Sequence, residues 1–256
     1  MSPLQLFALI CVFAVIRVVL HFRPATAPAA SGVGLGVDEK PTPPASTATD
    51  VLREYLDAFI VAGLVALFLI TFVIRTFYIP SGSMEPTLQI HDVLLVNEFE
   101  YRTTAPHDGD IVVFKPPLDT PNDFIKRVIG SPGERLRIHN GLVYRNDVPL
   151  AEPYTAQAPA YELEIKDYGI YVDGQPLDPA VANIPPREQW SAPDRIPAGC
   201  YFMMGDNRNN SEDSHFWGFA QPSGTFWSGS QKSLRAGFTG HAFLLFWPPQ
   251  RLRILK

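Results

Sequence analysis

Two apolar segments dominate the N-terminal part of the 256-residue chain. The first covers residues 3–20 and contains one charge, Arg17, and the second covers residues 58–79 and contains one charge, Arg75. A membrane-spanning helix needs roughly 20 mostly apolar residues, and an arginine near its end can extend to the interface. The sequence therefore predicts two transmembrane helices, at residues 1–20 and 57–77.

The first segment has an alternative interpretation as a cleavable signal peptide, because residues 25–29 supply the small side chains found at cleavage sites. No Lys or Arg precedes the segment, whereas Arg17 and Arg23 lie at or beyond its end. This polarity is opposite to that of a signal peptide and favours a retained anchor whose N-terminus lies outside.

Residues 21–56 separate the two segments and are predicted to form a linker. They are rich in Pro, Ala, Thr, Ser and Gly, a composition that buries too little surface to fold. The linker carries Arg23, Lys40 and Arg53, whereas no basic residue precedes the first segment. Because basic residues favour the cytoplasmic side, we expect the linker in the cytoplasm and residues 78–256 outside.

The rest of the chain shows short β-type runs bounded by turn residues. Two pairs between such runs, Asn140-Gly141 and Asp173-Gly174, indicate β-hairpin turns. Residues 147–199 are rich in proline and less regular, which indicates an inserted subdomain. The sequence predicts a mainly β domain of antiparallel sheets at residues 78–256, anchored by the two N-terminal transmembrane α-helices.

The charge balance argues against a nucleic-acid partner. The chain has 21 basic and 26 acidic residues, a formal net charge of -5, and no basic cluster that would follow a phosphate backbone. Cys11 lies in an apolar segment far from Cys200, and the six histidines include no pair one helical turn apart. We therefore expect no nucleic acid, no disulfide and no metal site.

A turn-rich motif at residues 79–88 (IPSGSMEPTL) directly follows the second apolar segment. By itself it fits an ordinary turn between a membrane segment and a domain, where serine and glycine are common. Three further motifs accompany it, at residues 109–114 (GDIVVF), 124–134 (FIKRVIGSPGE) and 205–214 (GDNRNNSEDS).

Lys126 stands out in the motif at residues 124–134 because strand alternation places it on the same face as Phe124 and Val128. Burial lowers the pKa of a lysine amine from about 10.4 by up to several units, which leaves a neutral amine at working pH. A serine hydroxyl beside such an amine becomes a competent nucleophile. Alternatively, the side chain extends to solvent or pairs with a carboxylate.

Together and in this order, the four motifs resemble the type I signal peptidases, the bacterial leader peptidase family of Ser/Lys proteases. The resemblance covers residues 75–218, the two-anchor layout and the C-terminal strand. It implies that Ser83 is the nucleophile and Lys126 the general base. The other implied site residues are Ser81 in the oxyanion hole, Ser211 orienting the amine, and Gly205, Asp206 and Asp213 in supporting positions.

The resemblance also implies a reaction and a setting. Neutral Lys126 takes the proton of Ser83, which attacks a peptide carbonyl, and water then hydrolyses the acyl-enzyme without any metal or cofactor. The implied reaction removes N-terminal signal peptides from exported preproteins after small-x-small sites. The resemblance further implies a multi-pass protein of the bacterial plasma (inner) membrane, with its catalytic domain on the extracytoplasmic side. The implied partners are the lipid bilayer and the export translocon.

Shallow apolar pockets select the substrate in this family. The positions that match them are Phe77, Ile79, Leu88, Phe124 and Ile125. Each is equally consistent with core packing, because pocket walls and cores are built from the same residue types.

Two positions depart from the family pattern. His215 stands where many bacterial members have arginine, and Asn209 stands where an aspartate is common. A contact between Asp213 and His215 would be favoured by charge only when the imidazole is protonated. Alternatively, His215 is exposed and has no role.

Three other classes share parts of this pattern. A soluble self-cleaving Ser/Lys repressor needs an N-terminal DNA-binding module, in whose place this chain has two apolar segments. A penicillin-recognising enzyme needs Ser-x-x-Lys, and no serine here has a lysine three residues later. A tethered assembly or chaperone domain without catalysis is disfavoured by the joint presence of Ser81, Ser83, Lys126 and Ser211.

Overall fold

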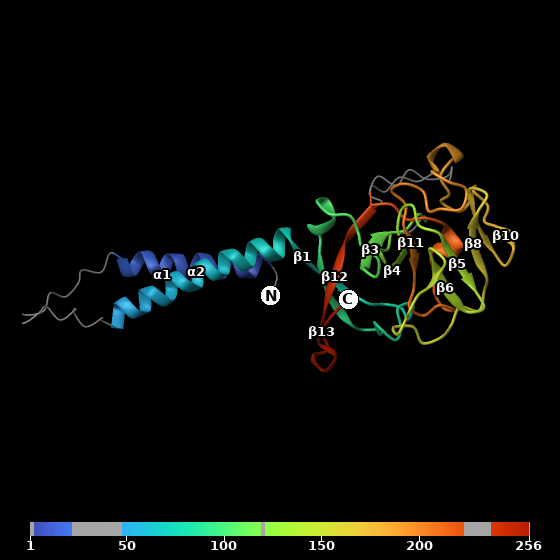
Figure 1. Cartoon of the computed structure of the whole chain (residues 1–256). Helices are drawn as coiled ribbons and strands as arrows, with labels where there is room; N and C mark the ends of the chain where they lie inside the picture. Colours follow the sequence, from blue (N-terminus) through green and yellow to red (C-terminus); the bar gives the residue numbers. More distant parts are fainter. Residues whose placement is uncertain (1–2, 22–47, 119–120, 223–236, 256) are drawn as a thin grey trace, which may run out of the picture. The chain divides into compact units, whose positions relative to one another are not determined.

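The computed structural model describes residues 3–21, 48–118, 121–222 and 237–255 of the chain. The chain divides into two compact units, Met1–Val73 and Ile74–Lys256. The first unit contains helices α1 (Pro3–His21) and α2 (Ala48–Phe72), both labelled in Figure 1. Their contacts include an ion pair of 2.7 Å between Arg17 and Asp57 and a ring contact between Phe13 and Phe59.

The N-terminal helices differ from the prediction in character. Within the described residues, neither helix combines the length and the apolar character that crossing a bilayer requires. The structure therefore does not support the prediction that residues 1–20 and 57–77 are transmembrane helices.

The bounds of the second helix also differ from the prediction. Helix α2 begins at Ala48, within the predicted linker 21–56, most of which lies outside the described residues. It ends at Phe72, because residues Ile74–Tyr78 form strand β1 instead. This run contains β-branched and aromatic side chains, which favour a strand, and it pairs with the neighbouring strand over its whole length.

The second unit contains two antiparallel sheets (Figure 1). The first sheet has the strand order β1-β2-β12-β3-β4-β11, and β13 also pairs with β12. Its strands after β1 are β2 (Val93–Asn97), β3 (Ile111–Lys115), β4 (Phe124–Gly130), β11 (Phe202–Met204), β12 (Gly237–Trp247) and β13 (Arg253–Ile254). The C-terminal strand β12 thus lies inside the sheet, between β2 and β3, and the unit begins at Ile74 rather than at residue 78.

The second sheet has the order β10-β9-β8-β5-β6-β7. Its strands are β5 (Leu136–His139), β6 (Leu142–Arg145), β7 (Val148–Pro149), β8 (Leu163–Lys166), β9 (Gly169–Val172) and β10 (Gln175–Pro176). Since β5 pairs with β8, the predicted subdomain boundary at residue 147 cuts through this sheet. Short helical turns complete the unit: η1 (Glu100–Arg102), η2 (Arg187–Gln189), α3 (Ser214–Trp217) and η3 (Pro249–Arg251).

The prediction of a mainly β, antiparallel domain is confirmed, and so are both hairpin turns. Asn140 and Gly141 connect β5 to β6 with φ of 51° and 74°, and Asp173 and Gly174 connect β9 to β10 with φ of 50° and 79°. Both central residues of such two-residue turns need positive φ, which Asn, Asp and Gly tolerate best.

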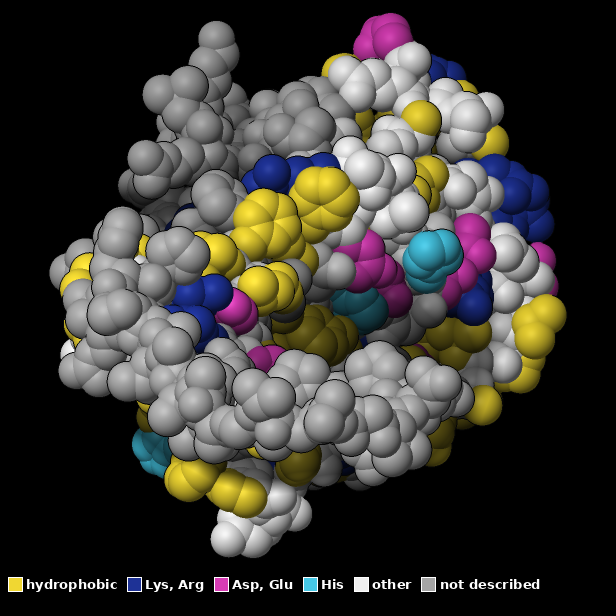
Figure 2. All heavy atoms as spheres, turned by 90° about the vertical axis from the view of Figure 1, so that its left-hand side faces the viewer, with side chains coloured by type: hydrophobic (Ala, Val, Ile, Leu, Met, Phe, Trp, Pro, Cys, Tyr) yellow, Lys and Arg dark blue, Asp and Glu magenta, His cyan; other side chains and the backbone are white. Residues whose placement is uncertain are grey.

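Strand β3 is buried on both faces and marks the centre of the first sheet. Ile111 and Val113 pack into one hydrophobic cluster, and Val112 and Phe114 into another on the opposite face. A third cluster lies between the second sheet and residues of β4 and β11. On the face shown in Figure 2, hydrophobic, basic and acidic side chains of the described residues are interspersed.

Candidate active site

Ser83 and Lys126 meet in the second unit, 43 positions apart in the sequence. Ser83 lies in the connection between β1 and β2, whereas Lys126 projects from β4, where it pairs in register with Val112. The Lys126 Nζ lies 2.8 Å from the Ser83 Oγ, and the lysine side chain is 3% exposed. A hydroxyl and an amine are therefore within hydrogen-bond distance in a largely dry environment.

Backbone and side-chain contacts fix the segment that carries Ser83. Met84 and Leu88, which follow Ser83 in the chain, are buried and anchor the segment to the core. Asn207 donates from its side chain to the Gly82 carbonyl at 3.0 Å and from its backbone to the Ser83 carbonyl at 3.1 Å. The loop after β11 therefore holds the segment that carries Ser83 in place.

The amine of Lys126 has an altered acidity. Burial lowers its pKa from 10.5 to about 8, and the nearby carboxylates of Asp213, Glu212 and Asp206 oppose part of this change. The lowered pKa has a simple cause, because removing an ammonium group from water disfavours its charged form. A sizeable neutral fraction at mildly alkaline pH makes this amine a suitable general base.

Arg127, the neighbour of Lys126, forms a buried ion pair with Asp206. Its guanidinium donates to both carboxylate oxygens, at 2.9 and 2.7 Å, and also to the Gly109 carbonyl at 2.8 Å. Strand β11 pairs with β4 so that Met204 lies opposite Arg127. The loop that begins at Gly205 therefore starts directly beside β4, the strand that carries Lys126.

Gly205 lies against the nucleophile segment and leaves no room for a side chain. A Cβ at this position would lie 2.2 Å from the Ser211 Oγ and 2.4 Å from the Ser83 carbonyl oxygen. The Gly205 N–H donates to Asp213 at 2.9 Å. The predicted supporting residues Gly205, Asp206 and Asp213 are thus brought together beside the dyad.

Ser211 does not make the contact with the Lys126 amine that the sequence predicted. Its hydroxyl is buried against Gly205 and has no hydrogen-bond partner among the described residues. The predicted hydrogen bond between Ser211 and Lys126 is therefore not formed in this structure, in which the amine contacts the Ser83 Oγ. Ser81, in contrast, is exposed and lies in the wall of the cavity in front of Ser83.

This cavity, of about 630 Å³, contains both Ser83 and Lys126 in its wall. Of the five predicted pocket residues, Phe77, Phe124 and Ile125 line it. Ile79 and Leu88 do not, since both are at most 2% exposed and pack into the core against β2 and β3. The further lining residues, which the sequence pattern did not single out, are Tyr78, Pro80, Gly82, Asn122, Asp123, Asn210 and Glu212.

His215 is buried, which contradicts the alternative that it is exposed without a role. Its Nδ1 lies 2.5 Å from the Asp213 Oδ1, and its ring stacks on that of Tyr161 with 4.3 Å between centroids. Asn209 accepts the N–H of Ala160 at 2.8 Å and donates to the Ala158 carbonyl at 2.9 Å. An aspartate at position 209 could make only the first of these contacts.

A segment that the sequence did not single out supports the site. We call residues 152–161 the strap. Glu152 forms a bidentate ion pair with the fully buried Arg208 at 2.7 and 2.6 Å. The Arg127 guanidinium lies 4.0 Å from the centroid of the Tyr154 ring. Together with Tyr161, these residues connect the strap to the strand of the base and to residues 205–215.

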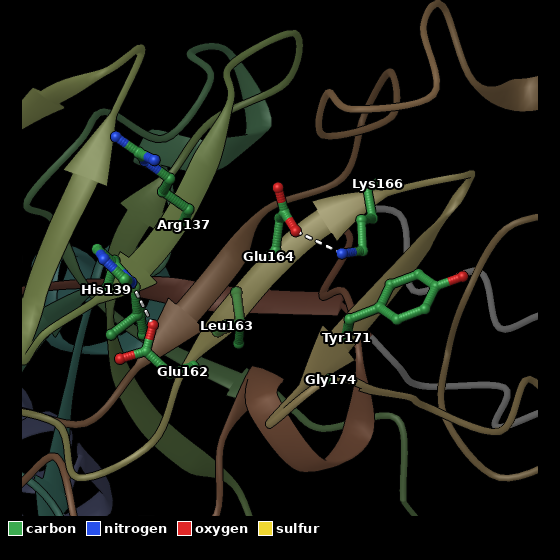
Figure 3. A pocket seen from close by; sticks show the side chains of 9 residues that line it. Arg137, His139, Glu162, Leu163, Glu164, Lys166, Tyr171 and Gly174 are labelled. Carbon is green, nitrogen blue, oxygen red and sulfur yellow. Dashed lines mark hydrogen bonds and ion pairs between the residues drawn. The ribbon is translucent and has the colours of Figure 1, made fainter.

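A second, smaller cavity of about 180 Å³ lies on the second sheet (Figure 3). Four of its charged side chains form two pairs, with His139 2.7 Å from Glu162 and Lys166 2.6 Å from Glu164, whereas Arg137 pairs with neither carboxylate. Among the residues that the structure describes, no group of three or more His, Cys, Asp or Glu side chains could hold a metal ion. Ser83 and Lys126 lie in the wall of the larger cavity and not in this one.

A serine hydroxyl beside a buried amine of lowered pKa, at the wall of an open cavity, is the arrangement of a hydrolase that uses an activated serine. Comparison with known proteins gives the family. The model of the family described as "Signal peptidase, peptidase S26" matches residues 52–226. The chain belongs to this signal peptidase family, which makes it a peptidase.

Curated relatives agree with this assignment. The chain is 37% identical over 222 residues to a protein of Synechocystis sp. strain PCC 6803 named probable signal peptidase I-2, covering 85% of this chain and 81% of the relative. It is 35% identical over 224 residues to signal peptidase I of Leptolyngbya laminosa, covering 82% of this chain and 90% of that one. A solved signal peptidase I structure from Enterococcus faecalis V583 covers 47% of this chain and 92% of its own, with 28% identity and a TM-score of 0.31.

Proposed function

We propose that this chain is a membrane-anchored serine endopeptidase that removes N-terminal signal peptides from exported preproteins. The observation that carries the proposal is the 2.8 Å contact between the Lys126 Nζ and the Ser83 Oγ at the wall of the cavity. Membership of the signal peptidase family supplies the substrate class.

The proposed reaction is acyl transfer through Ser83. Neutral Lys126 accepts the hydroxyl proton while the Ser83 Oγ bonds to the carbonyl carbon of the scissile peptide. Collapse of the tetrahedral intermediate breaks the C–N bond, and the Lys126 ammonium gives its proton to the leaving amine. Lys126 then deprotonates a water, which hydrolyses the ester and releases Ser83.

The developing oxyanion needs hydrogen-bond donors in front of Ser83. We assign this role to the Ser81 hydroxyl, which lies at the cavity wall, and to the backbone N–H of Ser83. Ser211 is a positioning residue in this proposal, since its buried hydroxyl packs against Gly205 beside the nucleophile. Asp206 and Asp213 act through Arg127 and Gly205 respectively.

Apolar walls account for the proposed cleavage after small-x-small sites. Phe77, Phe124 and Ile125 line the cavity close to the dyad, and bulky walls leave room for small substrate side chains. Ile79 and Leu88 contribute indirectly, because they pack beneath the segment that carries Ser83.

We place the reaction at the extracytoplasmic face of the bacterial plasma membrane, with the lipid bilayer and the export translocon as partners. Exposed apolar side chains support contact with lipid. In the helices they include Val12, Val15, Val18, Phe59, Val61 and Val65, and in the β unit Tyr78, Phe246, Trp247, Leu252 and Ile254. Flotation of the full chain with lipid vesicles tests the contact with lipid, and a protein that stays at the bottom of the gradient while the vesicles float would contradict it.

The catalytic assignment is tested by cleavage of a preprotein in detergent micelles. The native chain should cut after a small-x-small site, and Ser83→Ala and Lys126→Ala should both abolish the cut. Ser191→Ala and Lys166→Ala are matched controls, because they remove the same groups from positions outside this cavity. Cleavage that survives either dyad substitution would refute the Ser/Lys assignment.

A further inference from the structure

Glu212 is a carboxylate in the wall of the catalytic cavity. The buried residues Ser211 and Asp213 flank it in the same loop, whereas the Glu212 side chain itself is exposed. It forms no hydrogen bond or ion pair with any other residue that the structure describes. An exposed acidic group therefore faces the space in which the peptide bond must bind.

The charges around the cavity leave Glu212 uncompensated. The other carboxylate in the described lining, Asp123, forms an ion pair of 3.2 Å with Lys115. Lys126 is the one basic residue of that lining, and it must be neutral to act as the base. When Lys126 is neutral, no positive side chain in the described lining therefore balances the negative charge of Glu212.

We propose that Glu212 selects substrates by charge. Its carboxylate attracts a Lys or Arg side chain beside the scissile bond and repels an Asp or Glu side chain there. The inference rests on the proposed function, because it requires a peptide to bind in this cavity. Exposed charge pairs of this kind change affinity or rate by roughly two- to fivefold, and salt weakens the effect.

The test uses preproteins that differ at a single position. Lys, Gln or Glu is placed in turn at the middle of the small-x-small site and at the first and second positions after the cut. The readout is the ratio of kcat/KM for the Lys substrate to that for the Glu substrate, at pH 9 and low ionic strength. At this pH most of Lys126 is neutral, because its pKa is about 8.

The native chain should prefer Lys over Glu at one or more of these positions by about two- to fivefold. Glu212→Gln should bring the ratio close to one, and Glu212→Lys should invert it. Glu188→Gln is the matched control, since Glu188 is an exposed glutamate in η2, outside the cavity lining. Its ratio should equal the native ratio.

The ratio within one variant cancels any effect of the substitution on folding or on the strength of the base. Equal ratios in the native chain and in Glu212→Gln, with cleavage intact, would overturn the inference alone. A native ratio of one at all three positions would do the same. Failure of the native chain to cut even the Gln substrates would overturn the proposed function and the inference with it.

Discussion

The imidazole of His215 lies almost flat against the ring of Tyr161, with an interplanar angle of 15°. The same imidazole contacts one carboxylate oxygen of Asp213, and the other oxygen accepts the N–H of Gly205. A continuous set of contacts thus leads from the strap to the glycine that lies against the nucleophile segment. His215 is therefore a connecting residue between the strap and Gly205.

Replacing His215 with Ala is expected to lower the free energy of unfolding by about 1–3 kcal/mol, because the buried Asp213 carboxylate loses its side-chain partner. The kcat should fall as well, since Asp213 also holds Gly205. Urea unfolding and preprotein cleavage measure the two effects. His215→Arg supplies a new charge-assisted donor and should recover part of the kcat, and a native kcat in His215→Ala would contradict this account.

The cleavage rate should depend on pH through Lys126. Because the base acts in its neutral form and its pKa is about 8, kcat/KM should rise roughly tenfold per pH unit below pH 8 and level off above it. About one tenth of the amine is neutral at pH 7. A pH series with one preprotein measures the profile, and a flat profile between pH 6 and pH 9 would exclude Lys126 as the base.

Removing the buried amine should stabilise the fold in a pH-dependent way. The folded-state pKa of about 8 lies below the unfolded value of 10.5, so burial of the charged amine lowers stability most below pH 8. This cost, about 3 kcal/mol, declines as pH rises from 8 towards 10.5.

Lys126→Met should therefore unfold at higher urea concentration than the native chain at pH 7 and show little gain near pH 11. Lys166→Met, at an exposed position, is the control and should show no gain at pH 7. A loss of stability in Lys126→Met at pH 7 would mean that the charged amine is well compensated.

Gly205→Ala should impair both folding and catalysis. The new Cβ would come within 2.4 Å of the Ser83 carbonyl oxygen, which is a backbone atom and cannot move without displacing the nucleophile. We expect a loss of stability of about 1–3 kcal/mol and a fall in kcat of at least tenfold. Gly169→Ala is the control, because the nearest atom to its Cβ lies at 3.6 Å, and near-native kcat in Gly205→Ala would disprove the proposed contact.

Ile125 and Ile79 should respond differently to truncation. Ile125→Ala enlarges the cavity that contains Ser83 and should relax the preference for small residues before the cut. Ile79→Ala creates a void in the core and should cost about 2–5 kcal/mol of stability with the cleavage-site preference unchanged. Mapping of cut sites by mass spectrometry, together with urea unfolding, distinguishes the two, and an unchanged preference in Ile125→Ala would remove it from the pocket.

Local sequence signals predicted those parts of the fold that local physics decides. The Asn140-Gly141 and Asp173-Gly174 turns follow from the need for positive φ, and they lie where predicted. The predicted extent of the second helix was wrong because the apolar segment continues past Arg75 to residue 79 with no composition change that marks the start of a strand. Only their pairing with β2 shows that they form a strand.

The residues of the candidate site could not be predicted from local sequence patterns, because their contacts join positions far apart in the chain. The contact between Ser83 and Lys126 was expected from family resemblance alone, because no local pattern joins positions so far apart. Ile79 and Leu88 looked like pocket residues because walls and cores share residue types. The sequence did not predict the roles of Glu152, Tyr154 and Tyr161. A single glutamate or tyrosine in a proline-rich stretch carries no local signature of its partner.

The strap has a consequence for the exchange of parts between relatives. Asn209 recognises two backbone groups of the strap, and His215 recognises the Tyr161 ring. A chimaera that takes residues 152–161 from another member of the family, without the matching residues at 209 and 215, would thus lose these contacts. The strap and residues 205–215 would therefore have to be exchanged together, although about 50 residues of chain separate their contacting positions.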